Sequence, residues 1–167
     1  MYTTGKESTM DLWFSEKHTP DVKLSLRIEK QLFSKTSDYQ RIDIFESREF
    51  GRVLSLDGNI MLTERDAFIY NEMIVHVPMA VHKNISKVLI IGAGDGGVVK
   101  ELTRYSRIQH IDLVEMDPMV VEACRQYLPG NACQLDDERV FIHYENALKF
   151  IRYRENEIGR ASCRERV

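Results

Sequence analysis

The chain has 167 residues, 43% of them hydrophobic and 29% charged. This balance is typical of a soluble globular protein and excludes a disordered chain. The net charge of -3 offers none of the excess basic charge that nucleic acids and anionic membranes attract, so we expect neither as a partner.

Other sequence features narrow the class of protein further. No apolar run approaches the ~20 residues of a membrane span, and the polar first ten residues lack the apolar core of a signal peptide. The three cysteines (Cys124, Cys133 and Cys163) have no metal-ligand spacing. We therefore expect a cytoplasmic protein with no disulfide framework and no metal site.

The first third of the chain is predicted to be a small antiparallel β domain over residues 10–65, with four to six strands. Residues 24–28 and 42–46 have apolar positions typical of strands. Two further apolar runs, 53–56 and 60–63, flank Asp57-Gly58, which is a strong hairpin signal because these residues tolerate a positive φ.

A helix is predicted to begin near residues 63–66, whose sequence resembles a capping box, and apolar residues then recur at helical spacing up to Val77. Pro78 should bend or interrupt this helix. It leads into a second predicted domain, residues 66–156.

The second domain alternates between short apolar strands and helices. Strands are predicted at residues 88–91, 111–114 and 140–142, and the helices that follow them at 97–105, 118–128 and 147–154. This alternation predicts an incomplete, doubly wound α/β sheet of the Rossmann-like, methyltransferase type.

Residues 157–167 do not continue this alternation, because a fourth apolar strand is due and the sequence there is polar and charged. We expect a truncated chain with an unrelated tail. A natural polar C-terminus is the alternative.

Residues 92–97 form a glycine-rich loop between a predicted strand and a predicted helix. Gly92, Gly94 and Gly96 allow a sharp turn close to a ligand, and the helix N-terminus offers free N–H groups. The spacing fits both dinucleotide sites and methyltransferases. Asp95 would repel a pyrophosphate and therefore favours a cationic ligand, such as a sulfonium nucleoside or an amine. Alternatively, Asp95 only caps the next helix.

Acids and amides also follow the next two predicted strands. Glu115 is placed to accept hydrogen bonds from ribose hydroxyls, and Asp117, which precedes Pro118, is expected to cap the following helix. Asn146 could hydrogen-bond an adenine edge, or it could be an ordinary turn asparagine.

Taken in order, these motifs resemble those of the spermidine synthase family from about residue 10 to residue 154. The glycine loop is similar to the Gly-Gly-Gly-Asp-Gly-Gly loop of that family. The other motifs that carry the resemblance are Trp13-Phe14-x-Glu16, Tyr39-Gln40, Phe50-Gly51-x-Val53-Leu54-x-Leu56-Asp57-Gly58, Thr63-Glu64-Arg65-Asp66 and Tyr70-Asn71-Glu72-Met73.

The resemblance implies transfer of an aminopropyl group from decarboxylated S-adenosylmethionine to putrescine, giving spermidine and methylthioadenosine. It implies no tightly bound cofactor, and a homodimer or homotetramer when the protein is complete. It also implies the site residues. The amine is expected at Tyr70, Asn71 and Asp95, and the nucleoside at Gln40, Gly92, Gly94, Asp95, Gly96, Glu115, Asn146 and Ala147.

Three departures qualify this resemblance. Asn71 stands where the family usually has glutamine or histidine, and Asn146-Ala147 stands where it usually has Asp-Gly. The family's catalytic base is an aspartate on the next strand, which we expect to lie beyond this chain. Non-catalytic binding by a fragment, or methyl transfer from S-adenosylmethionine, are the alternative functions, although the N-terminal motifs argue against a methyltransferase.

Overall fold

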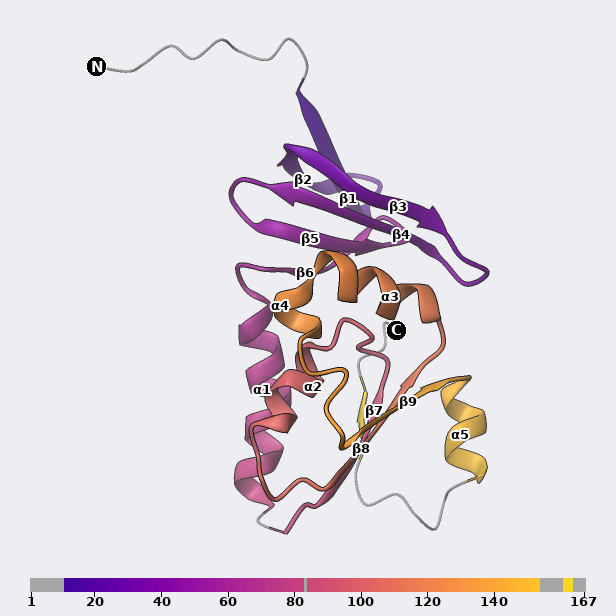
Figure 1. Ribbon diagram of the computed structural model, residues 1–167. Helices are drawn as coiled ribbons and strands as arrows, with labels where there is room; N and C mark the ends of the chain where they lie inside the picture. Colours follow the sequence, from indigo (N-terminus) through magenta and orange to yellow (C-terminus); the bar gives the residue numbers. More distant parts are fainter. Residues whose placement is uncertain (1–10, 83, 154–160, 164–167) are drawn as a thin grey trace, which may run out of the picture.

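The computed structural model describes residues 11–82, 84–153 and 161–163 (Figure 1). Six antiparallel strands in two sheets make up the N-terminal part, as the sequence predicts. The two-stranded sheet pairs β1 (Leu12–Thr19) with β2 (Val22–Ile28). The four-stranded sheet contains, in order, β3 (Lys30–Thr36), β4 (Arg41–Ser47), β5 (Gly51–Leu56) and β6 (Asn59–Thr63).

The predicted hairpin joins β5 to β6. Asp57 and Gly58 both have left-handed backbone conformations, with φ of 51° and 78°. Glycine adopts this conformation without steric cost, and aspartate tolerates it better than most residues do. This explains why the turn forms at Asp57 and Gly58.

Helix α1 (Ala67–Val81) begins next to residues 63–66, as predicted, with Asp66 at its N-cap, but it is not interrupted at Pro78. Thr63 belongs to β6 and donates its hydroxyl to Asp66 Oδ1 at 2.6 Å, so the helix begins after the predicted capping box. The helix also continues through Pro78 to Val81, and His82 N donates to Pro78 O at 3.0 Å. Pro78 removes one backbone donor, but the last turn still closes through this bond.

The second part is a parallel sheet with helices between its strands. Its strands are ordered β10-β7-β8-β9, and β7 therefore has a neighbour on each side. The elements are β7 (Lys87–Ile91), α2 (Gly97–Thr103), β8 (His110–Glu115), α3 (Pro118–Tyr127), α4 (Pro129–Ala132), β9 (Val140–Tyr144), α5 (Ala147–Tyr153) and β10 (Ala161–Cys163). Strand–helix alternation was predicted correctly, whereas the short helix α4 was not predicted.

The expectation that no further strand follows the last helix is wrong. Ala161–Cys163 pairs with Leu89–Ile91 as a short parallel strand at the edge of the sheet. Backbone hydrogen bonds of a parallel ladder need no long apolar run, so the short segment Ala161-Ser162-Cys163 can occupy this edge. The expected end of the last helix at Arg154 and the tail residues 157–160 and 164–167 lie outside the described residues.

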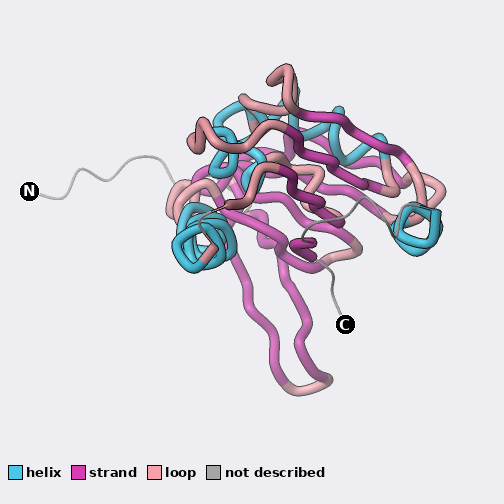
Figure 2. The backbone as a smooth tube through the Cα atoms, turned by 90° about the horizontal axis from the view of Figure 1, so that it is seen from below, coloured by secondary structure: helices cyan, strands magenta, loops and turns pink. Residues whose placement is uncertain are grey.

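The two faces of the parallel sheet are covered by different helices. Val88, Ile90, Ile111 and Leu113 pack into a large core with buried side chains of α1, α2 and α3. Leu89, Ile91 and Val114 point to the other face and pack against Phe150 of α5. Figures 1 and 2 show α1 and α5 on opposite sides of these strands.

The N-terminal sheets lie beyond the carboxyl ends of β7 and β8 (Figure 1). The ring of Phe33 in β3 packs in a tilted arrangement against Tyr127 of α3, with 5.5 Å between the ring centroids, and Arg52 donates to the Tyr127 carbonyl at 2.6 Å. Among the described residues, no helix is both long enough and apolar enough to cross a membrane.

Candidate functional site

The glycine-rich loop connects β7 to α2 at the carboxyl edge of the sheet. Gly96 has a φ of 83° and precedes the first residue of α2. Gly94 lies close to Glu115, because a Cβ on Gly94 would be 2.9 Å from Glu115 Oε2. A larger residue at this position would therefore push the Glu115 side chain out of the position that it has here.

Glu115 ends β8 and is half-buried beside this loop. Its Oε2 accepts from Gly94 N at 3.1 Å, and its Oε1 accepts from Asp117 N at 3.0 Å. Burial raises the pKa of the Glu115 carboxyl above 4.5, and these backbone hydrogen bonds oppose that rise. Since each carboxylate oxygen has two lone pairs, both can still accept from a ligand hydroxyl.

Asp117 is the N-cap of α3, as predicted, and its Oδ1 accepts from Met119 N at 3.0 Å. Its other oxygen, Oδ2, accepts from Ser37 Oγ at 2.7 Å and from Gln40 Nε2 at 3.0 Å. These bonds bring the β3–β4 turn to the edge of the parallel sheet. Asp117 thereby links Gln40, Glu115 and Gly94 by hydrogen bonds into one continuous network, which we call the polar chain.

Asp95 is buried, and its Oδ1 accepts from Gly97 N at 3.0 Å, at the first residue of α2. This contact is the one that the capping alternative requires, although the N-cap residue itself is Gly96. The cation-binding role of Asp95 remains a prediction.

The two amine-site residues on α1 differ in environment. Tyr70 is 44% exposed, whereas Asn71 is 4% exposed and packs directly against Gly97, where a Cβ would meet its Nδ2 at 2.1 Å. Within the described part of the chain, Asn71 Oδ1 is buried without a hydrogen-bond partner. Asn71 and Asp95 therefore meet at the same residue, Gly97, and Asn71 brings an unused acceptor there.

Asn146 lies at the exposed end of β9, and its Oδ1 accepts from Leu148 N at 2.9 Å and from Lys149 N at 3.3 Å. These are the bonds of a helix N-cap, so they support the turn-asparagine alternative. Ala147 packs against the Leu89–Phe150 cluster on the α5 face. The adenine-binding role of both residues remains a prediction.

A cluster of ionisable residues on α1 and α2 lies outside this site. The ligand atoms of Glu72, His76 and Glu101 lie within 4.8 Å of one another. Arg104 donates to Glu101 Oε2 at 2.6 Å, and His76 Nε2 lies 3.2 Å from the same oxygen. Arg104 therefore already supplies the positive charge that these acids would require from a metal ion.

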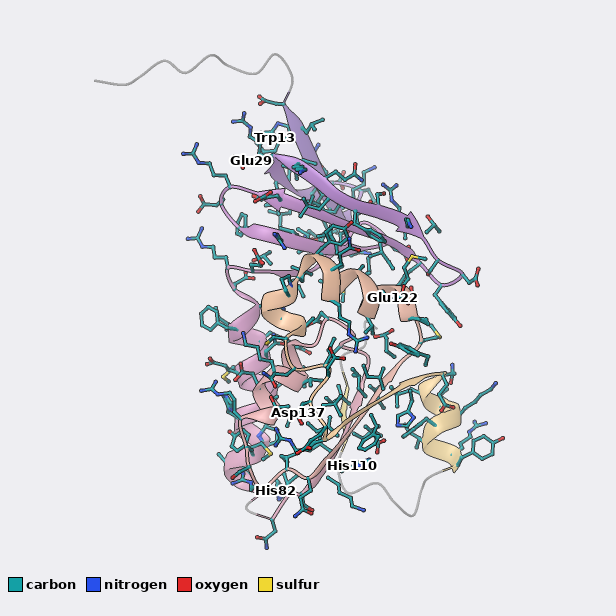
Figure 3. All side chains as sticks on the ribbon, in the orientation of Figure 1. Trp13, Glu29, His82, His110, Glu122 and Asp137 are labelled. Atoms are coloured by element: carbon teal, nitrogen blue, oxygen red, sulfur yellow. The ribbon has the colours of Figure 1, made fainter. Side chains whose placement is uncertain are left out.

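A cavity of about 550 Å³ lies in the N-terminal part, between the β1–β2 hairpin and the four-stranded sheet. Trp13 lies over this region, far from the parallel sheet (Figure 3). None of the predicted site residues belongs to the described lining of this cavity. The polar chain at the carboxyl edge, rather than the cavity, is the candidate site.

Sequence reasoning missed Ser37 and the second role of Asp117. Ser37 accepts from Tyr39 N and Gln40 N, both at 3.1 Å, which is a pattern expected of a serine three residues before a turn ends. That pattern could have identified the turn. Its contact with Asp117 spans 80 residues and could not be read from local sequence.

Comparison with known protein families gives two consecutive matches. Residues 12–64 match a family described as the spermidine synthase tetramerisation domain. Residues 67–159 match one described as the spermine/spermidine synthase domain.

Curated relatives include the polyamine aminopropyltransferases of Clostridium botulinum (strain Alaska E43 / Type E3), 60% identical, and of Lachnoclostridium phytofermentans, 55% identical. Each alignment covers 89% of this chain and 52% of the relative, so the chain spans about half the length of the curated relatives it matches.

Solved structures agree with these matches. The crystal structure of spermidine synthase from Thermotoga maritima superposes with a TM-score of 0.88 and 42% identity, covering 91% of this chain and 54% of that one. A spermidine synthase in complex with the transition-state analogue AdoDATO matches equally well, with a TM-score of 0.88. The matched domains, the relatives and the shared fold together show that this chain belongs to the spermidine synthase family.

Proposed function

We propose that this chain is the nucleoside-binding N-terminal portion of an aminopropyltransferase. The complete protein would transfer the aminopropyl group of decarboxylated S-adenosylmethionine to putrescine, releasing spermidine and methylthioadenosine. The observation that carries this proposal is the polar chain from Gln40 through Asp117 and Glu115 to Gly94, which lines the carboxyl edge of the sheet. In α/β proteins, ligands bind at this edge.

The nucleoside and the amine would meet at the glycine loop. Glu115 would accept from the ribose hydroxyls, and Asp95 would hold the cationic aminopropyl end of the donor. Asn71 Oδ1, buried without a partner in the described structure, would accept a hydrogen bond from an ammonium group. Because the sulfonium is already a good leaving group, positioning the attacking amine contributes most of the catalysis.

Putrescine also needs a base, because an alkyl amine with a pKa near ~10.4 is protonated at neutral pH and has no lone pair for attack. Asp95 and Glu115 are already engaged by backbone donors at the nucleoside side of the site. The family resemblance implies an aspartate base, which we expect to lie beyond this chain; β10, the strand that follows α5 here, contains no aspartate. We therefore expect this chain alone to transfer no measurable aminopropyl group.

The first test is binding. Titration calorimetry should detect methylthioadenosine binding by this chain, and Glu115→Gln should weaken it by ~1–3 kcal/mol, the usual scale for hydrogen bonds to a charged group. Glu122→Gln is the matched control, since Glu122 is exposed on α3 (Figure 3) and should leave the affinity unchanged. Equal affinities for the Glu115→Gln variant and the unsubstituted chain would remove Glu115 from the site.

The pH dependence of binding gives an independent check. Ribose hydroxyls donate best to an ionised carboxylate, and burial raises the pKa of Glu115. The affinity should therefore decline as the pH falls through a value above 4.5, the ordinary pKa of glutamate. The Glu115→Gln variant should lack this decline.

The second test is chemistry. A complete protein, incubated with decarboxylated S-adenosylmethionine and a panel of amines, should yield spermidine from putrescine. The 167-residue chain, assayed alongside it, should yield none. Methyl transfer from ordinary S-adenosylmethionine without aminopropyl transfer would contradict the proposed reaction, and turnover by this chain alone would mean that it contains its own base.

Assembly and location complete the proposal. The match of residues 12–64 to a tetramerisation domain supports a homodimer or homotetramer for the complete protein, which light scattering coupled to size-exclusion chromatography would measure. A polyamine-synthesising enzyme of this kind would act in the cytoplasm, where cell fractionation should recover it.

A further inference from the structure

Asp117 makes more contacts than a helix cap requires. Capping α3 uses only Oδ1, which accepts from Met119 N. The other oxygen receives two donors from a different part of the fold, Ser37 Oγ and Gln40 Nε2. Asp117 is 1% exposed, so water does not compete for these bonds. A buried carboxylate that binds three separate donors fixes the position of each of them.

The contact with Asp117 also fixes which end of the Gln40 amide faces the site. A carboxylate oxygen can only accept hydrogen bonds, so the amide nitrogen of Gln40 must point to Asp117. The amide oxygen is then directed away from Asp117 and is available as an acceptor. Ser37 reinforces this arrangement, because its hydroxyl donates to Asp117 while accepting from the backbone N–H of Gln40.

We propose that Asp117 is a positioning residue for nucleoside recognition, which orients Gln40 so that its Oε1 accepts a hydrogen bond from the donor nucleoside. Through its backbone N–H, Asp117 also holds Glu115 Oε1, so one residue sets both polar groups. This inference rests on the proposed function, since it requires a nucleoside at the carboxyl edge. The recognised group is a hydroxyl or amino donor of the ligand.

The substitution Asp117→Asn separates the capping role from the orienting role. An asparagine side chain can still cap α3 through its oxygen, but its amide nitrogen then faces Ser37 and Gln40. A donor in that position repels Gln40 Nε2, and the Gln40 amide must rotate and present its nitrogen to the ligand. The helix cap is kept while the acceptor offered to the nucleoside is lost.

A double-mutant cycle tests whether Asp117 acts through Gln40. Methylthioadenosine affinity is measured by calorimetry for the unsubstituted chain, Asp117→Asn, Gln40→Ala and the double variant. We expect Asp117→Asn to weaken binding roughly 10-fold in the presence of Gln40, and less than about twofold when Gln40 is already alanine. A residue with only a structural role would weaken binding by the same factor in both backgrounds.

The chain offers a matched control and a milder variant. Asp43 is also buried and also accepts from a serine, Ser34 Oγ at 2.7 Å, but it lies on β4 within the N-terminal sheet. Asp43→Asn should leave the affinity unchanged. Ser37→Ala removes one donor to Asp117 without altering a charge, and should weaken binding about threefold. If Asp117→Asn fails to fold, as judged by its thermal transition, Ser37→Ala in the two Gln40 backgrounds decides the question.

The outcomes separate this inference from the proposed function. Binding by the unsubstituted chain, with equal losses from Asp117→Asn in both Gln40 backgrounds or with no loss at all, would overturn the positioning role and leave the nucleoside site standing. No binding of methylthioadenosine by the unsubstituted chain would contradict the nucleoside site itself, and the inference with it.

Discussion

The two faces of the parallel sheet differ in how completely the described residues cover them. On one face, Ile111 and Leu113 lie beneath three helices in the largest core of the molecule. On the other, Leu89 and Val114 are covered by Phe150 of a single short helix, and Phe141 remains 46% exposed. The alternation of side chains along each strand gives both faces apolar residues, as expected of strands in a doubly wound sheet.

The two faces also carry different polar contacts. Arg139 donates to the carbonyl groups of Thr103, Tyr105 and Ile108. These hydrogen bonds connect the start of β9 to the segment between α2 and β8, beside the large core. On the other face, Asp112 lies between His110 and His143, with Nε2 atoms 3.0 Å and 2.6 Å from its oxygens. Because the apolar cluster on this second face is the smaller one, we expect this face to contribute less to stability.

Among substitutions that leave the chain folded, the largest expected effect comes from replacing a leucine by alanine on each face. Leu113→Ala should lower the free energy of unfolding by about 3–5 kcal/mol, because Leu113 is fully buried among helices that cannot collapse onto the cavity. Leu89→Ala, on the neighbouring strand and 3% exposed, should cost only about 2 kcal/mol, since fewer atoms surround it. Urea denaturation measures both. Equal losses would show that the faces are equally well packed.

The parts of the fold that were predicted correctly are those with a local signature. The apolar run at β7, the glycine loop and the Asp57-Gly58 hairpin each follow from a few adjacent residues. Pro78 was predicted to bend or interrupt α1; it does not interrupt the helix, because burial of Val75 and Met79 beneath the helix outweighs its local effect. Strand β10 was missed because only three residues form it, without an apolar run, and pairing with β7 places it.

In the candidate site, too, the features with a local sequence signature were predicted and the long-range contacts were not. Gly94 and Glu115 were placed correctly at adjacent strand ends, because parallel strands end at one edge of a sheet. The connection from Ser37 and Gln40 to Asp117 was not predicted, since it joins residues 77 or more positions apart and depends on how the N-terminal sheet packs. Long-range polar contacts of this kind carry no local sequence signal.

A smaller effect, with a defined pH dependence, is expected at Asp137. Hydrogen bonds from the Arg139 side chain and backbone lower the pKa of this carboxyl from 3.8 to about 2. A carboxyl with a lowered folded-state pKa adds stability above its unfolded pKa and loses it as the pH falls through the folded value. Asp137→Asn should therefore cost about 1–2 kcal/mol at pH 7, allowing for solvent screening.

That deficit should narrow as the pH falls from 3.8 toward 2, because Asp137 becomes protonated over this range. Urea midpoints at pH 7, 5, 4 and 3 measure the change. Asp136→Asn is the matched control, since Asp136 is highly exposed and its ion pair with Arg125 should contribute less than about 0.5 kcal/mol. A deficit that stayed constant with pH would mean that Arg139 holds its three carbonyl groups without help from the charge on Asp137.

The smallest expected effect on stability concerns α1, which has an exposed apolar side and a buried one. Met73 is 61% exposed and shares this outer side with Phe68, Ile69, Val77 and Val81. Met73→Lys should change the free energy of unfolding by less than about 0.5 kcal/mol, because both residues favour helices and neither is buried there. The same substitution at Met79, which is buried beneath the helix, should prevent folding, since an unpaired ammonium group would enter the core.

Met73→Lys should also reduce self-association of the protein, because an exposed apolar strip promotes association and a charge interrupts that strip. Light scattering at increasing protein concentration measures this, and unchanged association would show that the outer side of α1 is not the surface through which the chain associates.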